Sequence, residues 1–225
     1  MNSQQIIKEL RKHRNQKNID GMKRFGIAGQ EVIGWPSVPE MRKWGKQLGP
    51  DHKLAQELWK SGIHEARIIA GFTADPKLMT EKQMDSWVDD FDSWDICDQV
   101  CANLFDRTMF AEKKIGEWTK SEKEFVRRAG FVLICAKTVH NKIAKDSEFI
   151  KYFPLIKKYA IDKRNFVRKA VNWALRQIGK RNKTLNKKAI KLAENIKKID
   201  SKSARWIAND ALRELRDKKT IKRFK

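Results

Sequence analysis

A helical segment that recurs in the second half of this chain limits its possible folds more than any other feature. FVRRAGFVLICA begins at Phe125 and FVRKAVNWALRQI at Phe166, 41 residues later, and the two agree at Phe, Val, Arg, a basic residue and Ala. A weaker third copy, RWIANDALREL from Arg205, superposes on RKAVNWALRQI from Arg168 at an offset of 37. Units of this length with two helices each are typical of HEAT or armadillo repeats.

From residue 38 onward the apolar residues follow a helical period, and no stretch alternates as a half-buried strand does. The sequence therefore predicts an all-α protein, a HEAT/armadillo-like helical-repeat solenoid; two similar helices in an ordinary bundle would give the same match. We expect a single domain at 36–225. Residues 1–35 have a basic start and four Gly between 21 and 34, and they predict either a mobile arm or a helix lying over a DNA minor groove. The expected helices span 39–48, 51–60, 63–73, 80–91, 93–106, 108–117, 121–139, 147–160, 163–180, 184–197 and 201–217.

The charge of the chain is unevenly distributed. The 225 residues include 50 Lys and Arg against 28 Asp and Glu, a formal net charge of +22. Residues 1–110 contain 16 residues of each sign, so the whole excess belongs to residues 111–225. A surplus of this size predicts a polyanionic partner bound mainly by the second half. The 40% of apolar residues suffice for a core and exclude a disordered basic tail.

An acidic island interrupts the neutral half. It consists of six aspartates between Asp85 and Asp98, and no Lys or Arg occurs from 83 to 106. Helix-start chemistry explains Asp85, Asp92 and their neighbours, because Asp caps helices and favours the positive end of the helix dipole. Asp98 lies beyond the first turn of the predicted helix and fits that explanation poorly.

Two helical faces combine an aromatic ring with charge. On the helix over 166–180, Trp173 lies about 130° from the apolar stripe, on a face with Lys169, Arg176 and Lys180. Cations interleaved with an aromatic ring suit phosphates together with a sugar or base; alternatively, Trp173 packs on a neighbouring repeat.

In DSWDICDQVCANLF, Trp94 and Asp98 lie one turn apart at the edge of a stripe of apolar residues. An Asp held against an indole has a desolvated carboxylate, which can stabilise a cation that forms during a reaction. Hydrolysis of an N-glycosidic bond forms such a cation and needs an oriented water. A purely structural pair remains the alternative.

Other chemistries are not supported. Cys97 and Cys101 fall on the apolar stripe, and the four His have no metal-like spacing, so we expect no metal and no cofactor. The chain has no Walker-type loop and no G-x-S-x-G motif. It also has no apolar run long enough to cross a bilayer and no apparent signal peptide. We therefore expect a cytoplasmic protein without membrane contact, and nothing indicates an obligate oligomer rather than a monomer.

Several segments in order carry a family resemblance: SGIHEARIIAGF (61–72), SWVDDFDSWDICDQVCANLFDRT (86–108), FVRRAGF (125–131) and NFVRKAVNWALRQIGKRN (165–182). Over about 38–217 the chain resembles the AlkD-type DNA alkylation repair family. That resemblance implies a HEAT-like solenoid and a DNA glycosylase that excises cationic N3- and N7-alkylated purines from duplex DNA without cofactor or base flipping.

Residue by residue, the resemblance implies that Asp98 is the catalytic carboxylate and that Trp94 contacts the deoxyribose. It also implies that Trp173 forms the second aromatic wall and that Arg128 contacts the DNA backbone. The chain departs from the family pattern in two places. Ser93 precedes Trp94 where the best-known members have another Trp, and the segment between Arg128 and Trp173 is several residues longer.

The leading hypothesis is a DNA-alkylpurine glycosylase acting on 3-methyladenine and 7-methylguanine lesions. The alternatives are a non-catalytic HEAT-repeat protein that binds nucleic acid and a HEAT scaffold for an acidic protein partner.

Overall fold

The computed structural model describes residues 1–29 and 31–224. Within these ranges the chain is helical and has no strand; a single bridge joins Glu31 to Ile63. Internal contacts divide the chain into two compact units, residues 1–113 and 114–225. The first contains 17 residues of each charge, so the second contains the whole excess of +22.

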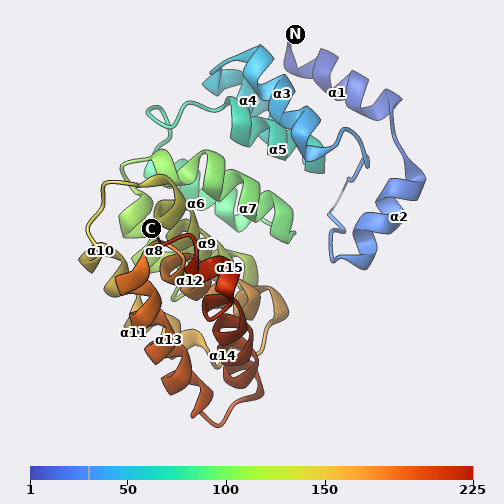
Figure 1. The fold of residues 1–225 in the computed structure, drawn as a ribbon. Coiled ribbons are helices and arrows are strands. Elements are labelled where there is room, and N and C mark those ends of the chain that lie inside the picture. The colour runs from blue at the N-terminus through green and yellow to red at the C-terminus, as the bar shows by residue number, and fades with distance from the viewer. Residues whose placement is uncertain (30, 225) are drawn as a thin grey trace. The chain divides into compact units, whose positions relative to one another are not determined.

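The first unit contains α1 (Ser3–Lys12), α2 (Gln16–Arg24), α3 (Val38–Leu48), α4 (His52–Lys60), α5 (His64–Thr73), α6 (Glu81–Asp89), α7 (Trp94–Asn103) and the 3-10 helix η1 (Phe105–Arg107) (Figure 1). The next helix, α8 (Ala111–Trp118), spans the division between the units. Residues 1–35 thus belong to the first unit. Two helices, α1 and α2, lie within this segment.

The first helix, α1, is stabilised by a capping box at its N-terminus and by packing of one apolar face. Asn2 caps α1 and forms a reciprocal capping box with Gln5, which satisfies amides that the helix leaves unpaired. Ile6 and Leu10 are fully buried, and α1 packs against α4 and α5. An apolar pair at i, i+4 on one face is sufficient to dock a helix of this length.

Polar contacts at a constant spacing of 31 residues join two helix pairs in the first unit, α4/α5 and α6/α7. Three polar contacts join residues at this spacing: His52 to Gln83 at 3.0 Å, Trp59 to Asp90 at 2.8 Å, and His64 to Asp95 at 2.8 Å. The partners are complementary rather than identical residues, so comparison of the sequence with itself does not detect this repeat. The first unit is therefore built from successive helix pairs.

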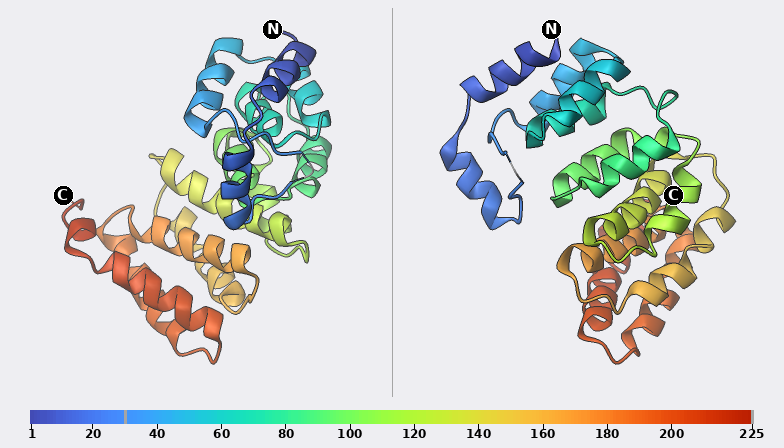
Figure 2. Two further views of the ribbon diagram at one scale, coloured as in Figure 1. Left: turned by 90° about the vertical axis from the view of Figure 1, so that its right-hand side faces the viewer. Right: turned by 180° about the vertical axis from the view of Figure 1, so that it is seen from behind.

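The second unit contains α9 (Glu124–His140), α10 (Ser147–Ile150), α11 (Phe153–Tyr159), α12 (Asn165–Gly179), α13 (Lys183–Lys197), α14 (Lys202–Leu215) and α15 (Lys218–Ile221). The central helix α12 packs against α9, α13 and α14, and α13 and α14 lie side by side (Figure 2). The three sequence copies become α9, α12 and α14. The equivalent rings of Phe125 and Phe166 lie 5.4 Å apart, so equivalent positions of successive copies touch.

A row of polar contacts, here called the α12–α14 ladder, joins these two helices. The Arg168 guanidinium lies 4.8 Å from the centre of the Trp206 ring. One turn further, Asn172 donates to Asp210 at 2.6 Å, and after another turn Arg176 pairs with Glu214. Each rung joins residues 38 apart, because both helices advance four residues per rung.

The predicted helices differ from the observed ones in several places. Those expected from 108 and 121 begin at Ala111 and Glu124, and α15 was not predicted. The helix expected over 147–160 is two helices, α10 and α11, with Pro154 in the first turn of α11, where a missing N–H costs nothing. The helix expected over 93–106 ends at Asn103, because the Leu104 backbone leaves helical dihedral angles. None of the helices described has both the length and the apolar character that membrane crossing requires.

Candidate functional site

Helix α7 carries the first pair of candidate residues. Ser93 takes the N-cap position with extended backbone, so the helix starts at Trp94, and Asp98 follows one turn later. The inward stripe of Cys97, Val100 and Cys101 is fully buried, as the sequence predicted. Trp94 and Asp98 are both half-buried at its edge. This arrangement confirms the predicted helical placement of the pair.

The Trp94 indole is anchored by its polar edge. Its Nε1 donates a hydrogen bond of 3.0 Å to the carbonyl oxygen of Phe25, the residue that ends α2. The indole N–H is therefore already hydrogen-bonded within the protein, and only the faces of the ring can contact another molecule. The N-terminal segment, whose role the sequence left open, positions this ring.

The two cysteines of α7 are packing groups. Burial raises the pKa of the Cys101 thiol well above its usual value, and a hydrogen bond with Cys97 and the charge of Asp98 add to the effect. A neutral thiol is a poor metal ligand. No group of three or more potential metal ligands occurs among the residues that the structure describes.

Most of the acidic island has partners inside the first unit. Asp90 accepts from the Trp59 indole and lies 3.7 Å from the Arg67 guanidinium, which is also 3.9 Å from Asp92. The N-caps of α6 and α7 are Thr80 and Ser93. Neither Asp85, which lies within α6, nor Asp92, which precedes the N-cap of α7, is therefore a capping residue.

A polar network in α5 went undetected in the sequence. His64, Glu65 and Arg67 are all buried in the first unit, although they lie in a helix of otherwise apolar character. Glu65 accepts hydrogen bonds from the backbone N–H groups of Ile33 at 3.0 Å and Gly34 at 2.7 Å. Three ionisable residues within a segment that reads as core are the signal that could have revealed it.

His64 and Asp95 form a buried pair in this network. Burial alone would lower the pKa of His64, but the hydrogen bond and charge of Asp95, with the charges of Glu65 and Asp92, raise it. Burial would likewise raise the pKa of Asp95, and the hydrogen bond and charge of His64 outweigh it and lower that pKa. The pair is therefore held in its charged form.

The second unit holds the remaining candidates on α12. Lys169 is exposed, and Trp173, Arg176 and Lys180 are partly buried. Arg176 pairs with Glu214, and the Lys180 ammonium lies 2.7 Å from the same carboxylate. Two of the three predicted phosphate-binding cations are thus engaged with an acidic side chain of α14, and Lys169 stands apart from that pairing.

Arg128 on α9 is buried, and its Nη1 donates to the carbonyl oxygen of Phe166 at 2.7 Å. Its neighbour Arg127 binds Asp162 at 2.7 Å and Glu122 at 2.8 Å. Burial would raise the pKa of Asp162, but hydrogen bonds from Arg164 and Arg127 lower it to about 2. The two arginines of FVRR therefore tie α9 to the start of α12, a structural role that the resemblance did not imply.

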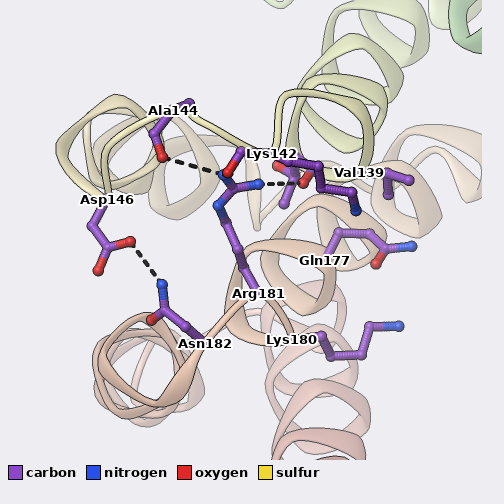
Figure 3. A pocket seen from close by; sticks show the side chains of 9 residues that line it. Val139, Lys142, Ala144, Asp146, Gln177, Lys180, Arg181 and Asn182 are labelled. Atoms are coloured by element: carbon purple, nitrogen blue, oxygen red, sulfur yellow. Dashed lines mark hydrogen bonds between the residues drawn. The ribbon is translucent and has the colours of Figure 1, made fainter. Parts of the chain in front are cut away.

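The longer segment between Arg128 and Trp173 forms one wall of a cavity in the second unit (Figure 3). Arg181 donates to three carbonyl oxygens of that segment, those of Thr138 at 2.9 Å, Lys142 at 2.9 Å and Ala144 at 3.2 Å. Its guanidinium also lies 4.4 Å from the centre of the Phe149 ring. One arginine thus fixes the additional residues against the end of α12.

Comparison with known proteins places the chain in a family. The family described as DNA alkylation repair enzyme matches residues 6–215. The chain belongs to the DNA alkylation repair enzyme family.

The fold of this family member has a relative among solved structures. That structure is described as belonging to a new family of proteins related to the HEAT-like repeat DNA glycosylases with affinity for branched DNA structures. The TM-score is 0.77, the identity is 21%, and the match covers 95% of each chain. The predicted all-α, HEAT-like repeat fold is confirmed. A search of curated proteins gives no match.

In this DNA alkylation repair protein the candidate residues belong to different units. Trp94 and Asp98 lie together on α7 of the first, neutral unit. Arg128 on α9, Lys169, Trp173 and Arg176 on α12, and Lys180 at the C-cap of α12 belong to the second, strongly basic unit. The carboxylate suited to chemistry and the cations suited to phosphates are thus carried by separate units.

Proposed function

We propose that this protein is a DNA glycosylase that hydrolyses the N-glycosidic bond of cationic alkylated purines, of the 3-methyladenine and 7-methylguanine type, in duplex DNA. The observation that carries the proposal is the half-buried Asp98 one turn after the anchored Trp94, in a chain of the DNA alkylation repair enzyme family.

The chemistry suits a single carboxylate. An alkylated purine already carries a positive charge, so the bond from its nitrogen to C1′ breaks without prior protonation and the base leaves neutral. The sugar then has oxocarbenium character, which a nearby carboxylate stabilises. Water adds its oxygen to C1′, and the carboxylate orients that water and accepts its proton. Asp98 is proposed for both tasks, and Trp94 for contact with the deoxyribose through its ring.

The basic second unit is proposed to bind the phosphates. Neutralised phosphates release counterions, so affinity should fall steeply with salt. Trp173 is proposed as the second aromatic wall, with Arg128, Lys169, Arg176 and Lys180 as backbone contacts. No base-reading element is proposed, so sequence preference should be slight. We propose that the protein acts as a monomer on DNA in the cytoplasm. The reaction would need no metal or organic cofactor, and the base would leave without being flipped out of the duplex.

Base release tests the proposal. Wild type, Asp98→Asn and Asp89→Asn are incubated with methylated duplex DNA at low salt, and free 3-methyladenine and 7-methylguanine are measured by chromatography. Asp89 is an exposed residue of α6, so its variant removes the same charge away from α7. Loss of Asp98 should slow release by roughly 10²-fold or more, with DNA binding equal or tighter. Normal release by Asp98→Asn would refute the proposed role.

A second candidate is binding of branched DNA without excision. Two observations favour it: the described affinity of the structural relative, and Ser93 at the N-cap of α7 where the best-known glycosylases have a Trp. This candidate predicts no base release by wild type, together with tighter binding to a four-way junction than to a linear duplex of equal length. The same preparations serve both measurements.

A further inference from the structure

A cavity in the second unit has the charge of a phosphate-binding site but lies outside the candidate residues named above. It has a volume of about 800 Å³ and lies where α12 and α14 begin. Its charged lining consists of Lys163, Arg168, Lys202 and Arg205 against a single carboxylate, Asp200. We call it the α12–α14 cavity.

The cations of this cavity are more available than those further along α12. Asp200 pairs with Arg205 at 2.9 Å, and both side chains are largely exposed. Lys163 and Lys202 are also exposed and form no ion pair with any residue in 1–29 or 31–224. Arg176 and Lys180, by contrast, share the carboxylate of Glu214. An incoming anion would therefore meet less competition at the cavity.

Arg168 is held in place rather than neutralised. Its guanidinium contacts the Trp206 ring and donates to the side-chain oxygen of Asn165 at 3.2 Å. Its Nε is buried and has no hydrogen-bond partner among the described residues. Contact with a ring leaves the positive charge in place and restricts the rotamers of the side chain, which lowers the entropic cost of binding an anion.

The walls of the cavity are fixed by local hydrogen bonds. Ser203 donates to the carbonyl oxygen of Asp162 at 2.6 Å, which joins the start of α14 to the turn before α12. Ser201 caps α14, and the positive end of this helix adds to the field of the four cations. Trp206 does not line the cavity, but its ring contacts Arg168 of the cavity wall and remains 37% exposed, which leaves it available to a sugar or base.

We propose that the α12–α14 cavity binds backbone phosphates of a DNA strand. This inference rests on the DNA binding proposed above and names a site for it apart from the Trp173 face. Clustered, unneutralised cations beside an exposed indole match a nucleic acid better than an acidic peptide, because a peptide carboxylate brings no ring to stack on Trp206. Lys163, Lys202 and Arg168 supply the charge, and Trp206 supplies the ring.

Paired charge deletions test the site. The double variant Lys163→Ala/Lys202→Ala is compared with Lys187→Ala/Lys188→Ala, which removes two exposed lysines of α13 and gives the same net charge. Binding to a short fluorescein-labelled duplex is followed by anisotropy over a salt series. The first variant should weaken binding by roughly tenfold at 0.1 M salt and reduce the salt slope by about two. The control should bind within about twofold of wild type, with an unchanged slope.

Three results would overturn the inference. One is equal weakening by the two double variants. Another is a Glu-rich peptide that competes as well as a single-stranded oligonucleotide of equal charge and loses affinity with Lys163 and Lys202, which would make the partner an acidic protein. The third is binding of inorganic phosphate to the cavity together with an unchanged DNA affinity of the Lys163→Ala/Lys202→Ala variant, which would make the ligand a free anion.

Failure of the proposed function is read separately, from base release by wild type and Asp98→Asn. If wild type releases no base but Lys163→Ala/Lys202→Ala selectively loses DNA binding, the proposed function fails and the cavity site is still supported. Normal release with equal effects of the two double variants would remove the cavity site alone.

Discussion

Nε2 of His64 lies 2.8 Å from Oδ2 of Asp95, and both side chains are buried in the first unit. The contact joins α5 to α7 one turn before Asp98, so it fixes the helix that carries the proposed catalytic carboxylate.

Removing the Asp95 carboxylate should lower the free energy of unfolding by about 3 kcal/mol, because a buried imidazolium would lose its partner. The raised pKa of His64 gives a contribution that is full below pH 6.5 and declines as pH rises through the folded-state pKa. The lowered pKa of Asp95 gives a contribution that is full above pH 3.8 and declines as pH falls through its folded-state pKa.

The stability difference between wild type and Asp95→Asn should therefore be largest from about pH 4 to 6.5 and smaller at pH 8.5. Urea unfolding at pH 5.5 and 8.5 measures it. A difference that does not change with pH would show that the pair is not charged.

Trp94→Phe should retain most base release, whereas Trp94→Ala should lose roughly tenfold, because stacking on a ring supplies about 1–2 kcal/mol. The reason is that the indole N–H is already bonded to the Phe25 carbonyl, leaving only the ring for the substrate. Single-turnover release from methylated duplex DNA measures both variants. If Phe is as damaging as Ala, the anchor to α2 matters more than the ring.

The three cations beside Trp173 should separate into two kinds. Lys169→Ala should leave stability within about 0.5 kcal/mol of wild type, because the side chain is exposed. Arg176→Ala should cost about 1 kcal/mol, because it leaves Glu214 without one of its partners. A double-mutant cycle with Glu214→Ala isolates that term; a coupling energy near zero would contradict the ladder.

Removing Lys169, Arg176 and Lys180 together should weaken binding to all duplexes alike and reduce the salt slope, as expected for phosphate contacts. Unchanged binding would leave the α12–α14 cavity as the main contact.

Two glycines of adjacent helices should respond oppositely to the same substitution. A Cβ on Gly130 of α9 would lie 2.7 Å from the backbone nitrogen of Thr119, so Gly130→Ala should cost about 2 kcal/mol or more. A Cβ on Gly116 of α8 meets no described atom within 4 Å, so Gly116→Ala should stabilise the protein by up to about 1 kcal/mol. Thermal unfolding compares them. Equal effects would contradict the close approach of α9 to Thr119.

Helical periodicity was sufficient to predict the fold from residue 38 onward, because each helix buries one face and local spacing records that face. It predicted Trp94 and Asp98 one turn apart on one helix edge. Helical periodicity could not predict the pairing of His64 with Asp95, because the partners lie 31 residues apart and each alone resembles an isolated polar residue. Nor could charge counting distinguish Arg176, which faces Glu214, from Lys163, which forms no ion pair within the described part of the chain.

The α12–α14 ladder has a consequence for how repeats keep their alignment. Apart from the ladder, the buried residues of these two helices are mostly Ala, Val, Leu and Ile, and Gly179 of α12 lies close to Leu215 of α14. A slip of one turn in one direction would set Arg168 against Lys202 instead of Trp206. In the other direction, Arg176 and Lys180 would face the end of α14, beyond Glu214. The ladder thus adds to the register that the apolar packing of the two helices sets.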